Sequence, residues 1–204
     1  MKGLGKLQLA EPAGEAEETD GRRRRSQDSR ARIVAAMLDL VREGEASPGA
    51  ETVAARAEVG LRTVFRHFKD MDSLYGEMSN AIEGELRAVV AQPLRAETAH
   101  GRVLELIERR STAFEKIAPF KHAAEAHRHN SAFLAAGHTR LVTESREILE
   151  RLAPPEILAD PTRLEALDLL LSFEAWSRLR RDQGLSAEMT RDVLAAAVNR
   201  LLEG

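Results

Sequence analysis

Apolar residues recur at helical spacing along almost the whole chain, and the apolar-polar alternation of strands does not occur. The first clear stripe starts near residue 29, and its members fall at i, i+4, i+7 and i+8: Ile33, Met37, Leu40 and Val41. Gly44 and Pro48 end this stripe, because glycine and proline interrupt helices. The pattern predicts an all-α protein.

Two short helices are predicted directly after this stripe. The first spans about residues 51–57 and the second about residues 61–67, with a turn of roughly three residues between them. A longer helix followed by two short ones that are joined by a tight turn is the outline of a three-helix helix-turn-helix domain. We expect this domain over residues 28–70.

The rest of the chain, residues 71–204, is predicted to form a larger helical domain. Pro119 suits the first turn of a helix, Asp160 and Pro161 suit an N-cap and first turn, and Ser186 suits another N-cap. The expected helices span about residues 71–91, 98–118, 119–129, 131–152, 161–183 and 186–202.

Composition narrows the classes of protein. The 204 residues suffice for one large domain or two small ones, and 43% of them are hydrophobic, as in globular proteins. The absence of cysteine excludes a disulfide framework, a thiolate metal site and a cysteine nucleophile. No apolar run approaches the roughly eighteen residues of a membrane span. We therefore expect a soluble, cytoplasmic protein with no membrane partner.

Charge is distributed unevenly along the chain. The formal net charge is −3, yet residues 22–69 hold eleven Arg and Lys against six Asp and Glu, a balance of +5. A basic module joined to an acidic body suggests that the module binds a polyanion. Residues 1–27 lack a periodic apolar face, and we expect a disordered arm that ends in the basic tract Arg22–Arg25. Arg25 and its neighbours are either a solvated charge run or a DNA-contacting arm.

The segment 61–69 combines basic and apolar residues in a way that suits DNA. On a helix, Leu61, Val64 and Phe68 share one side that can pack on a small core, and a second side carries Arg62, Phe65, Arg66 and Lys69, with Thr63 and His67 between the two. Arginine is the commonest reader of guanine edges in the major groove, and Thr, His and Lys suit phosphate oxygens. The alternative is a basic surface helix without a partner. The predicted DNA-binding residues are Arg25, Leu61, Arg62, Thr63, Phe65, Arg66, His67 and Lys69.

Two stretches also carry a family resemblance. The sequences RIVAAMLDLVREG and VAARAEVGLRTVFRHFKDMDSL resemble the N-terminal domain of TetR-family transcriptional regulators. The resemblance implies an all-helical homodimer. Its small N-terminal domains would bind an operator, and its larger domains would bind an effector that alters operator affinity.

Three residues depart from the family pattern. Glu58 stands where the family usually has a turn glycine, so we expect a left-handed conformation that costs roughly 1–2 kcal/mol at a residue with a side chain. Phe65 replaces a tyrosine and cannot hydrogen-bond a phosphate. Met71 replaces a lysine at the start of the next helix.

The predicted helix over residues 161–183 is apolar nearly all round, so it needs cover on two sides. We expect it to form a four-helix dimer interface with the helix over residues 186–202, which places the homodimer contact within about 161–202. The alternative is a monomer that buries both sides internally.

The histidines and aromatic residues of the body suggest a ligand pocket rather than a metal site. His122, Glu125 and His129 share a helix face and could hold a metal, but a solvated face is the better interpretation, and we predict no metal. His138 lies on an apolar stripe, either as a satisfied core residue or as the polar group of a pocket. The candidate pocket residues are Phe114, Phe120, Phe133, His138, Phe173 and Trp176.

These observations predict a one-component transcriptional regulator, most simply a repressor that a small-molecule effector releases from double-stranded operator DNA. No enzymatic activity and no cofactor are predicted. Two alternatives stay open: an architectural DNA-binding protein without an effector, and a helical bundle that binds a metal or another ligand.

Overall fold

The computed structural model describes residues 13–204, and these form helices without a strand. The prediction of an all-α protein is confirmed. In chain order the elements are α1 (Ala13–Arg42), α2 (Ala50–Arg56), α3 (Leu61–His67), α4 (Met71–Val90), α5 (Ala99–Arg128), α6 (Ala132–Leu152), α7 (Pro155–Leu158), α8 (Pro161–Leu170), α9 (Phe173–Ser177), the π-helical turn η1 (Arg178–Asp182) and α10 (Ala187–Glu203).

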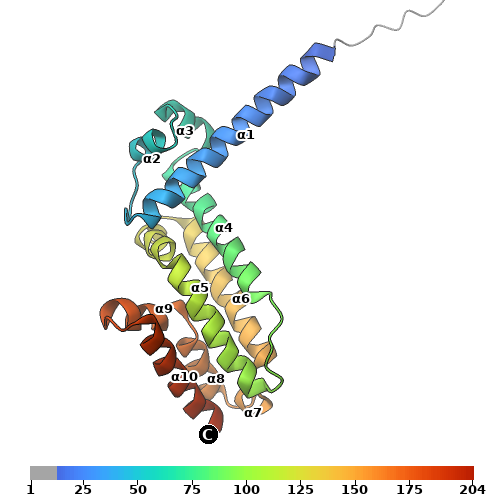
Figure 1. Cartoon of the computed structure of the whole chain (residues 1–204), viewed down its shortest axis with the longest axis vertical. Helices are drawn as coiled ribbons and strands as arrows, with labels where there is room; N and C mark the ends of the chain where they lie inside the picture. The colour runs from blue at the N-terminus through green and yellow to red at the C-terminus, as the bar shows by residue number, and fades with distance from the viewer. Residues whose placement is uncertain (1–12) are drawn as a thin grey trace, which may run out of the picture.

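Helices α1, α2 and α3 form a small unit at one end of an elongated molecule (Figure 1). Apolar side chains from all three helices are buried between them: Ile33, Met37, Val53, Ala54 and Val64. The predicted three-helix arrangement is therefore present. The N-terminal part of α1 projects beyond this unit, away from the body (Figure 1).

The expectation of a disordered arm over residues 1–27 is wrong for the residues that the structure describes. Residues 13–27 belong to α1, and residues 1–12 lie outside the described part of the chain. The segment is rich in Ala, Glu and Arg, which have high helix propensity, and it continues a helix that is already nucleated by packing further along.

The turn between α2 and α3 has the expected left-handed residue. Glu58 has φ of 53°, and it is the sole residue other than glycine with positive φ in the range 13–204. The Glu58 amide donates to the Ala55 carbonyl at 3.2 Å, and the Val59 amide donates to the Ala54 carbonyl at 3.0 Å. This pair of bonds is a Schellman motif, which usually places glycine at the position of Glu58.

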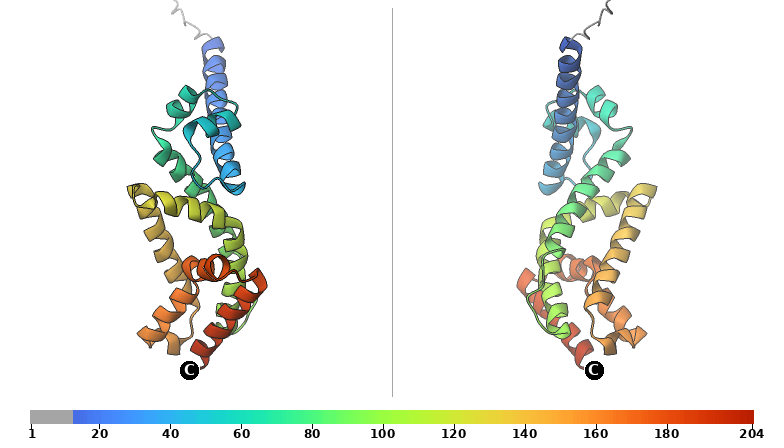
Figure 2. Two further views of the ribbon diagram at one scale, coloured as in Figure 1. Left: turned by 90° about the vertical axis from the view of Figure 1, so that its left-hand side faces the viewer. Right: turned by 90° about the vertical axis from the view of Figure 1, so that its right-hand side faces the viewer.

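Helices α4, α5 and α6 form the main part of the body, and α4 continues directly from the helix-turn-helix unit (Figures 1 and 2). Asp70 begins α4 with a capping box, in which its side chain accepts from the Ser73 amide at 2.8 Å. The two helices predicted over 98–118 and 119–129 are one helix, α5, which contains Pro119 and bends along its length (Figure 2). Ile117 and Phe120 are buried on either side of the proline, so packing keeps the helix continuous and the missing amide only bends it.

The helix predicted over residues 161–183 is broken into α8, α9 and η1. The break lies at Leu171 and Ser172. The Ser172 hydroxyl donates to the Leu169 carbonyl at 2.7 Å and accepts from the Ala175 amide at 3.1 Å, so it closes one helix and caps the next. Periodicity missed this break because the segment is apolar on both sides of it.

Helix α10 packs along α5 and α8. The Ser186 side chain caps it by accepting from the Met189 amide at 3.1 Å, as predicted. Near its C-terminus the Leu201 carbonyl accepts from Arg163 Nε of α8 at 2.9 Å. These contacts place α8 and α10 together on one side of the body.

Candidate DNA-binding surface and ligand cavity

Helix α3 presents a basic and partly apolar face to solvent. Val64 and Phe68 are almost completely buried, whereas Leu61 and Phe65 are 39% and 47% exposed. Leu61, Arg62, Phe65 and Arg66 share one side of the helix, and the exposed Lys69 follows two residues after its end; we call these five residues the α3 face. The placement of Leu61 on the buried side is therefore wrong, because the helix begins at this residue and leaves it at the rim.

The basic residues of the α3 face are not neutralised by neighbours. Within residues 13–204, Arg62, Arg66 and Lys69 take part in no salt bridge or side-chain hydrogen bond that the structure records. Arg56 on α2, by contrast, makes two hydrogen bonds with the Glu43 carboxylate at 2.7 and 2.8 Å. Arg56 attaches α2 to Glu43, the residue that follows α1, and its charge is neutralised there, unlike the charges of the α3 face.

Arg30 of α1 holds α3 in position, a role that no pattern in the sequence indicated. Its Nη1 donates to the His67 carbonyl at 3.1 Å, and its Nη2 pairs with Glu77 of α4 at 2.8 Å. The guanidinium also lies 4.4 Å from the centre of the Phe68 ring. One side chain therefore joins α1, the C-terminal end of α3 and the start of α4.

His67 is half-buried beside this contact. Its Nε2 is buried and has no hydrogen-bond partner among the described residues. Burial lowers the pKa of His67, and the nearby positive charges of Arg66 and Arg30 lower it further. A phosphate contact by this residue, as predicted, would have to use Nδ1. Thr63 is also half-buried, between the two sides of α3.

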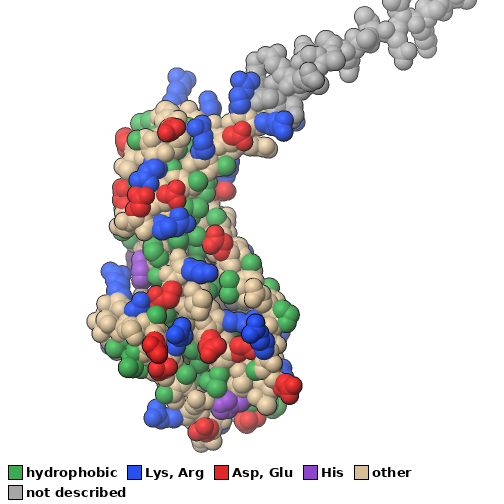
Figure 3. All heavy atoms as spheres, in the orientation of Figure 1, with side chains coloured by type: hydrophobic (Ala, Val, Ile, Leu, Met, Phe, Trp, Pro, Cys, Tyr) green, Lys and Arg blue, Asp and Glu red, His purple; other side chains and the backbone are tan. Residues whose placement is uncertain are grey.

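The exposed arginines of α1 add to the charge at this end of the molecule. Arg23, Arg24, Arg25 and Arg32 are exposed on α1. Figure 3 shows Lys and Arg side chains gathered over the end formed by α1 and α3. The predicted site residue Arg25 is thus carried by a helix rather than by a flexible arm.

The body contains an open cavity of about 580 Å³, which we call the α4–α6 cavity. Leu86 of α4, Phe114 of α5 and Leu141, Ile148 and Leu152 of α6 supply its apolar wall. Two of its charged lining residues satisfy each other, because Arg87 Nε donates to Glu144 at 3.1 Å. Its volume is within the range of roughly 300–1,000 Å³ that is typical of small-molecule sites.

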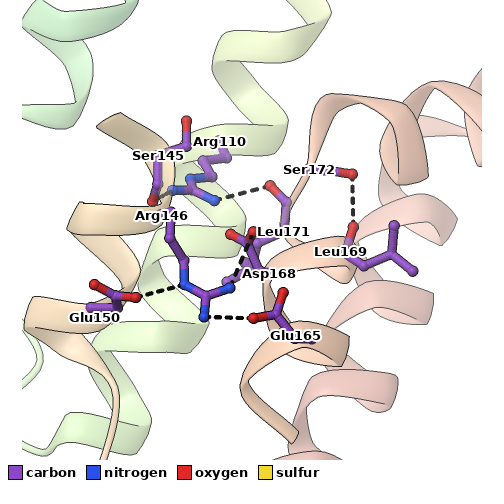
Figure 4. Close-up of polar contacts among 9 residues, drawn as sticks. All are labelled: Arg110, Ser145, Arg146, Glu150, Glu165, Asp168, Leu169, Leu171 and Ser172. Atoms are coloured by element: carbon purple, nitrogen blue, oxygen red, sulfur yellow. Dashed lines mark hydrogen bonds and ion pairs between the residues drawn. The ribbon is translucent and has the colours of Figure 1, made fainter. Parts of the chain in front are cut away.

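Arg110 of α5 also lines this cavity, although it was not among the predicted pocket residues. It is 5% exposed, and its guanidinium donates to the Leu171 carbonyl at 3.1 Å and to the Ser145 carbonyl at 2.9 Å (Figure 4). The Leu171 carbonyl belongs to the break between α8 and α9. A signal was present, since Arg110 falls between Ile107 and Phe114 at helical spacing and so had to share their buried side.

Two smaller spaces share the lining residues Leu86 and Leu141 with the α4–α6 cavity. One of about 40 Å³ is lined by Phe120, Phe133 and His138, and one of about 70 Å³ is lined by Phe114, His138 and Phe173. Burial lowers the pKa of His138 and, in the same region, that of Lys121.

Five of the six predicted pocket residues therefore line one of these spaces, and Trp176 lines none of them. Trp176 is 3% exposed and packs on Phe114 and Phe173, with ring centres 5.7 and 5.5 Å apart. It is a core residue.

The predicted histidine cluster does not assemble into a metal site. Among residues 13–204, no group of three His, Asp or Glu side chains is arranged to hold a metal ion. The segment Glu97–His100 has the Glu-x-x-His spacing of di-iron proteins, but His100 Nε2 contacts the Asn199 side chain at 2.7 Å. His127 likewise contacts Ser47 at 3.1 Å and stacks on Tyr75.

None of the helices in the described range has both the length and the apolar character that a membrane span requires. No family model matches the sequence, and no curated protein matches it. Solved structures do match it. A transcriptional regulator from Rhodococcus sp. Rha1 superimposes with a TM-score of 0.68 at 18% identity, over 86% of this chain and 96% of that one.

Two further structures give the same result. A candidate transcriptional regulator from Streptomyces coelicolor matches with a TM-score of 0.63 at 22% identity, over 86% of this chain and 99% of that one. A candidate TetR-family transcriptional regulator from Mesorhizobium loti matches with a TM-score of 0.57 at 16% identity, over 88% and 97%. The chain has the fold of TetR-type regulators. The TetR-type fold covers both the helix-turn-helix unit and the helical body, as the resemblance implied.

Proposed function

We propose that the protein is a DNA-binding transcriptional regulator. The observation that carries the proposal is the α3 face, where Arg62 and Arg66 on the second helix of a helix-turn-helix, and Lys69 just after it, are exposed and have no ion-pair partner among residues 13–204. The N-terminal residues of such a helix meet base edges, so Arg62 is placed to read sequence. Lys69 follows the last residue of α3 and is placed to contact the backbone. The apolar Leu61 and Phe65 can pack on thymine methyl groups or sugars.

We further propose that the protein binds DNA as a homodimer through α8 and α10. Helix α10 exposes a row of residues at i, i+4 and i+7 that includes Met189 and Val193, which are 50% and 39% exposed. On α8, Leu169 is 64% exposed. Exposed large apolar residues on two neighbouring helices suit a four-helix interface between two copies. Two copies would place two α3 helices on half-sites about 34 Å apart.

The α4–α6 cavity would bind the effector, and α4 would carry its effect to the DNA. Three residues separate the end of α3 from the start of α4, and α4 reaches the cavity at Leu86. Glu77 of the same helix pairs with Arg30, which holds the end of α3. A ligand that shifts α4 would therefore change the position of α3 in both copies, and release from an operator would make the protein a repressor.

Selection of bound duplexes from a randomised DNA library tests the regulator function. A regulator yields a motif with two-fold symmetry and half-sites about one helical turn apart, and its affinity for that motif is at least about 10³-fold above that for unrelated DNA. The architectural alternative yields bound DNA without a motif, and its affinity depends on salt alone. Absence of DNA binding would refute both.

A further inference from the structure

Arg110 is the one cation buried to 5% exposure in the described part of the body, and it borders the α4–α6 cavity. A charge in such a place loses its hydration, and the loss costs several kcal/mol unless other groups replace the water. Arg110 nevertheless has no carboxylate within hydrogen-bonding distance in residues 13–204. Backbone carbonyls of Ser145 and Leu171 are its recorded partners.

The nearest carboxylates are engaged elsewhere. Asp168 lies close enough to raise the pKa of Arg110, but it pairs with Arg146 at 3.6 Å (Figure 4). Arg146 also binds Glu150 and Glu165, each at 2.8 Å. This network is a separate cluster on α6 and α8, and within residues 13–204 it leaves the Arg110 guanidinium without a hydrogen-bonded carboxylate.

Arg110 has further N–H groups that make no recorded hydrogen bond within residues 13–204. A guanidinium has five N–H donors in a planar fork, and the two recorded bonds use one on each terminal nitrogen. Burial lowers the pKa of Arg110 to about 10, so the group stays charged at neutral pH. A desolvated, charged fork with donors to spare is the group that proteins use to bind a carboxylate.

The surrounding wall defines the rest of the ligand. Phe114 follows Arg110 by one helical turn, and Leu141, Ile148 and Leu152 line the cavity from α6. The charged pair Arg87 and Glu144 neutralises itself at the same cavity. Glu147 and Arg151 also line it, so the charged lining residues Arg87, Arg110, Glu144, Glu147 and Arg151 sum to +1. An apolar body is therefore matched by the wall, and a single negative charge is matched by the buried cation Arg110.

We propose that the α4–α6 cavity binds a small organic anion, an apolar chain or ring that carries one carboxylate, with the carboxylate on the Arg110 guanidinium. This proposal rests on the proposed function, because it takes the α4–α6 cavity as the effector site. It adds the chemical class of the effector. Because Arg110 also holds α6 and the α8–α9 break through Ser145 and Leu171, the anion would bind at the point where these elements meet.

Matched probes on the wild-type protein give the first test. Two series differ only in the polar group: decanoate, decan-1-ol and decylamine, and 4-phenylbutyrate, 4-phenylbutan-1-ol and 4-phenylbutylamine. Isothermal titration calorimetry measures each Kd at pH 7.5. We expect the carboxylate to bind about 10- to 100-fold more tightly than its alcohol, because charged hydrogen bonds to a buried donor are lost in the alcohol. Equal binding of the three polar groups, or no binding by either carboxylate, would refute the proposal.

Substitutions of Arg110 and Lys121 test which cation binds the carboxylate. Arg110→Met should remove the preference for carboxylate over alcohol, and Arg110→Lys should retain part of it, because lysine keeps the charge but not the fork. Lys121→Met is the matched control, since Lys121 lines the smaller neighbouring spaces. It should change carboxylate affinity by about twofold or less. If the preference for carboxylate over alcohol survives Arg110→Met, or disappears in Lys121→Met, then Arg110 is not the residue that binds the carboxylate, and the proposal is overturned. If Arg110→Met does not fold, the wild-type series and Arg110→Lys still decide.

Operator binding, measured with the same probes, separates this inference from the proposed function. A carboxylate that binds through Arg110 without changing affinity for the selected operator contradicts the effector role alone. Sequence-specific DNA binding together with no preference among the probes contradicts the anion site alone.

Discussion

Replacement of Glu58 by glycine should stabilise the protein. Glu58 has φ of 53° in the turn that sets α3 against α2. A residue with a Cβ atom pays roughly 1–2 kcal/mol for this conformation, and glycine pays almost nothing. Glycine costs about 0.5–1 kcal/mol more in lost chain entropy on folding. The difference leaves a net gain of about 0.5–1 kcal/mol.

The loss of the Glu58 side chain itself should matter little. Glu58 is exposed, and within residues 13–204 its carboxylate takes part in no recorded hydrogen bond or salt bridge. The Schellman bonds use the backbone amides of Glu58 and Val59, so they persist in the variant. Glu58→Ala is the matched control, because it removes the carboxylate and keeps the Cβ atom.

Urea unfolding followed by circular dichroism, at one fixed protein concentration, measures the effect. Fixed concentration is required because a dimer gains stability by mass action. We expect Glu58→Gly to raise the free energy of unfolding by about 0.5–1 kcal/mol and Glu58→Ala to change it by less than about 0.5 kcal/mol. Equal effects of the two substitutions, or destabilisation by glycine alone, would show that the turn does not carry the strain.

Further substitutions test the DNA surface, the dimer and the half-buried His138. Arg62→Ala should relax base preference at one position per half-site and cost about 1–3 kcal/mol on the preferred base, as measured by competition with a randomised operator library. Lys69→Ala should weaken binding to all sequences alike and reduce the salt slope by about one counterion, and the opposite pattern in the two variants would mean that α3 is oriented the other way. Val193→Asp should convert a dimer into monomers in light scattering at micromolar concentration, because it places a charge in the proposed interface; a wild-type mass of one chain would refute the interface. Burial lowers the pKa of His138, so the unfolded chain binds its proton more readily, and the resulting stability is present above pH of about 6.5 and lost as the pH falls below it. His138→Gln should therefore lessen the drop in unfolding free energy between pH 7 and pH 5, and an unchanged drop would count against a desolvated His138.

Local patterns in the sequence were sufficient for most of the helices. Residues such as Asp70, Thr98 and Ser186 cap the helices that follow them, and each cap depends on a side chain and an amide only two or three positions away. The left-handed turn at Glu58 could also be predicted, because the family resemblance aligns this residue with a turn glycine. The basic side of α3 followed from spacing alone.

Other features depended on contacts between residues far apart in the chain. Pro119 bends a helix instead of starting one, because Ile117 and Phe120 are held in the core on both sides of it. The long apolar segment after Pro161 breaks at Leu171, where Arg110, 61 positions earlier, takes the free carbonyl. Periodicity is equally consistent with a continuous and a broken helix in both places.

The candidate sites divide in the same way. The α3 face is a property of one short helix, so the sequence alone determined which side chains it exposes, apart from Leu61 at its first position. The open α4–α6 cavity is lined mainly by three helices. Its shape depends on how their side chains pack against one another. Aromatic residues in the sequence indicated a pocket but did not separate Trp176, which fills the core, from Phe114, which borders the cavity. Helical spacing indicated that Arg110 shares the buried side of α5, but only the tertiary structure decided that it borders that space without a hydrogen-bonded carboxylate among residues 13–204, because pairing is set by distant parts of the chain.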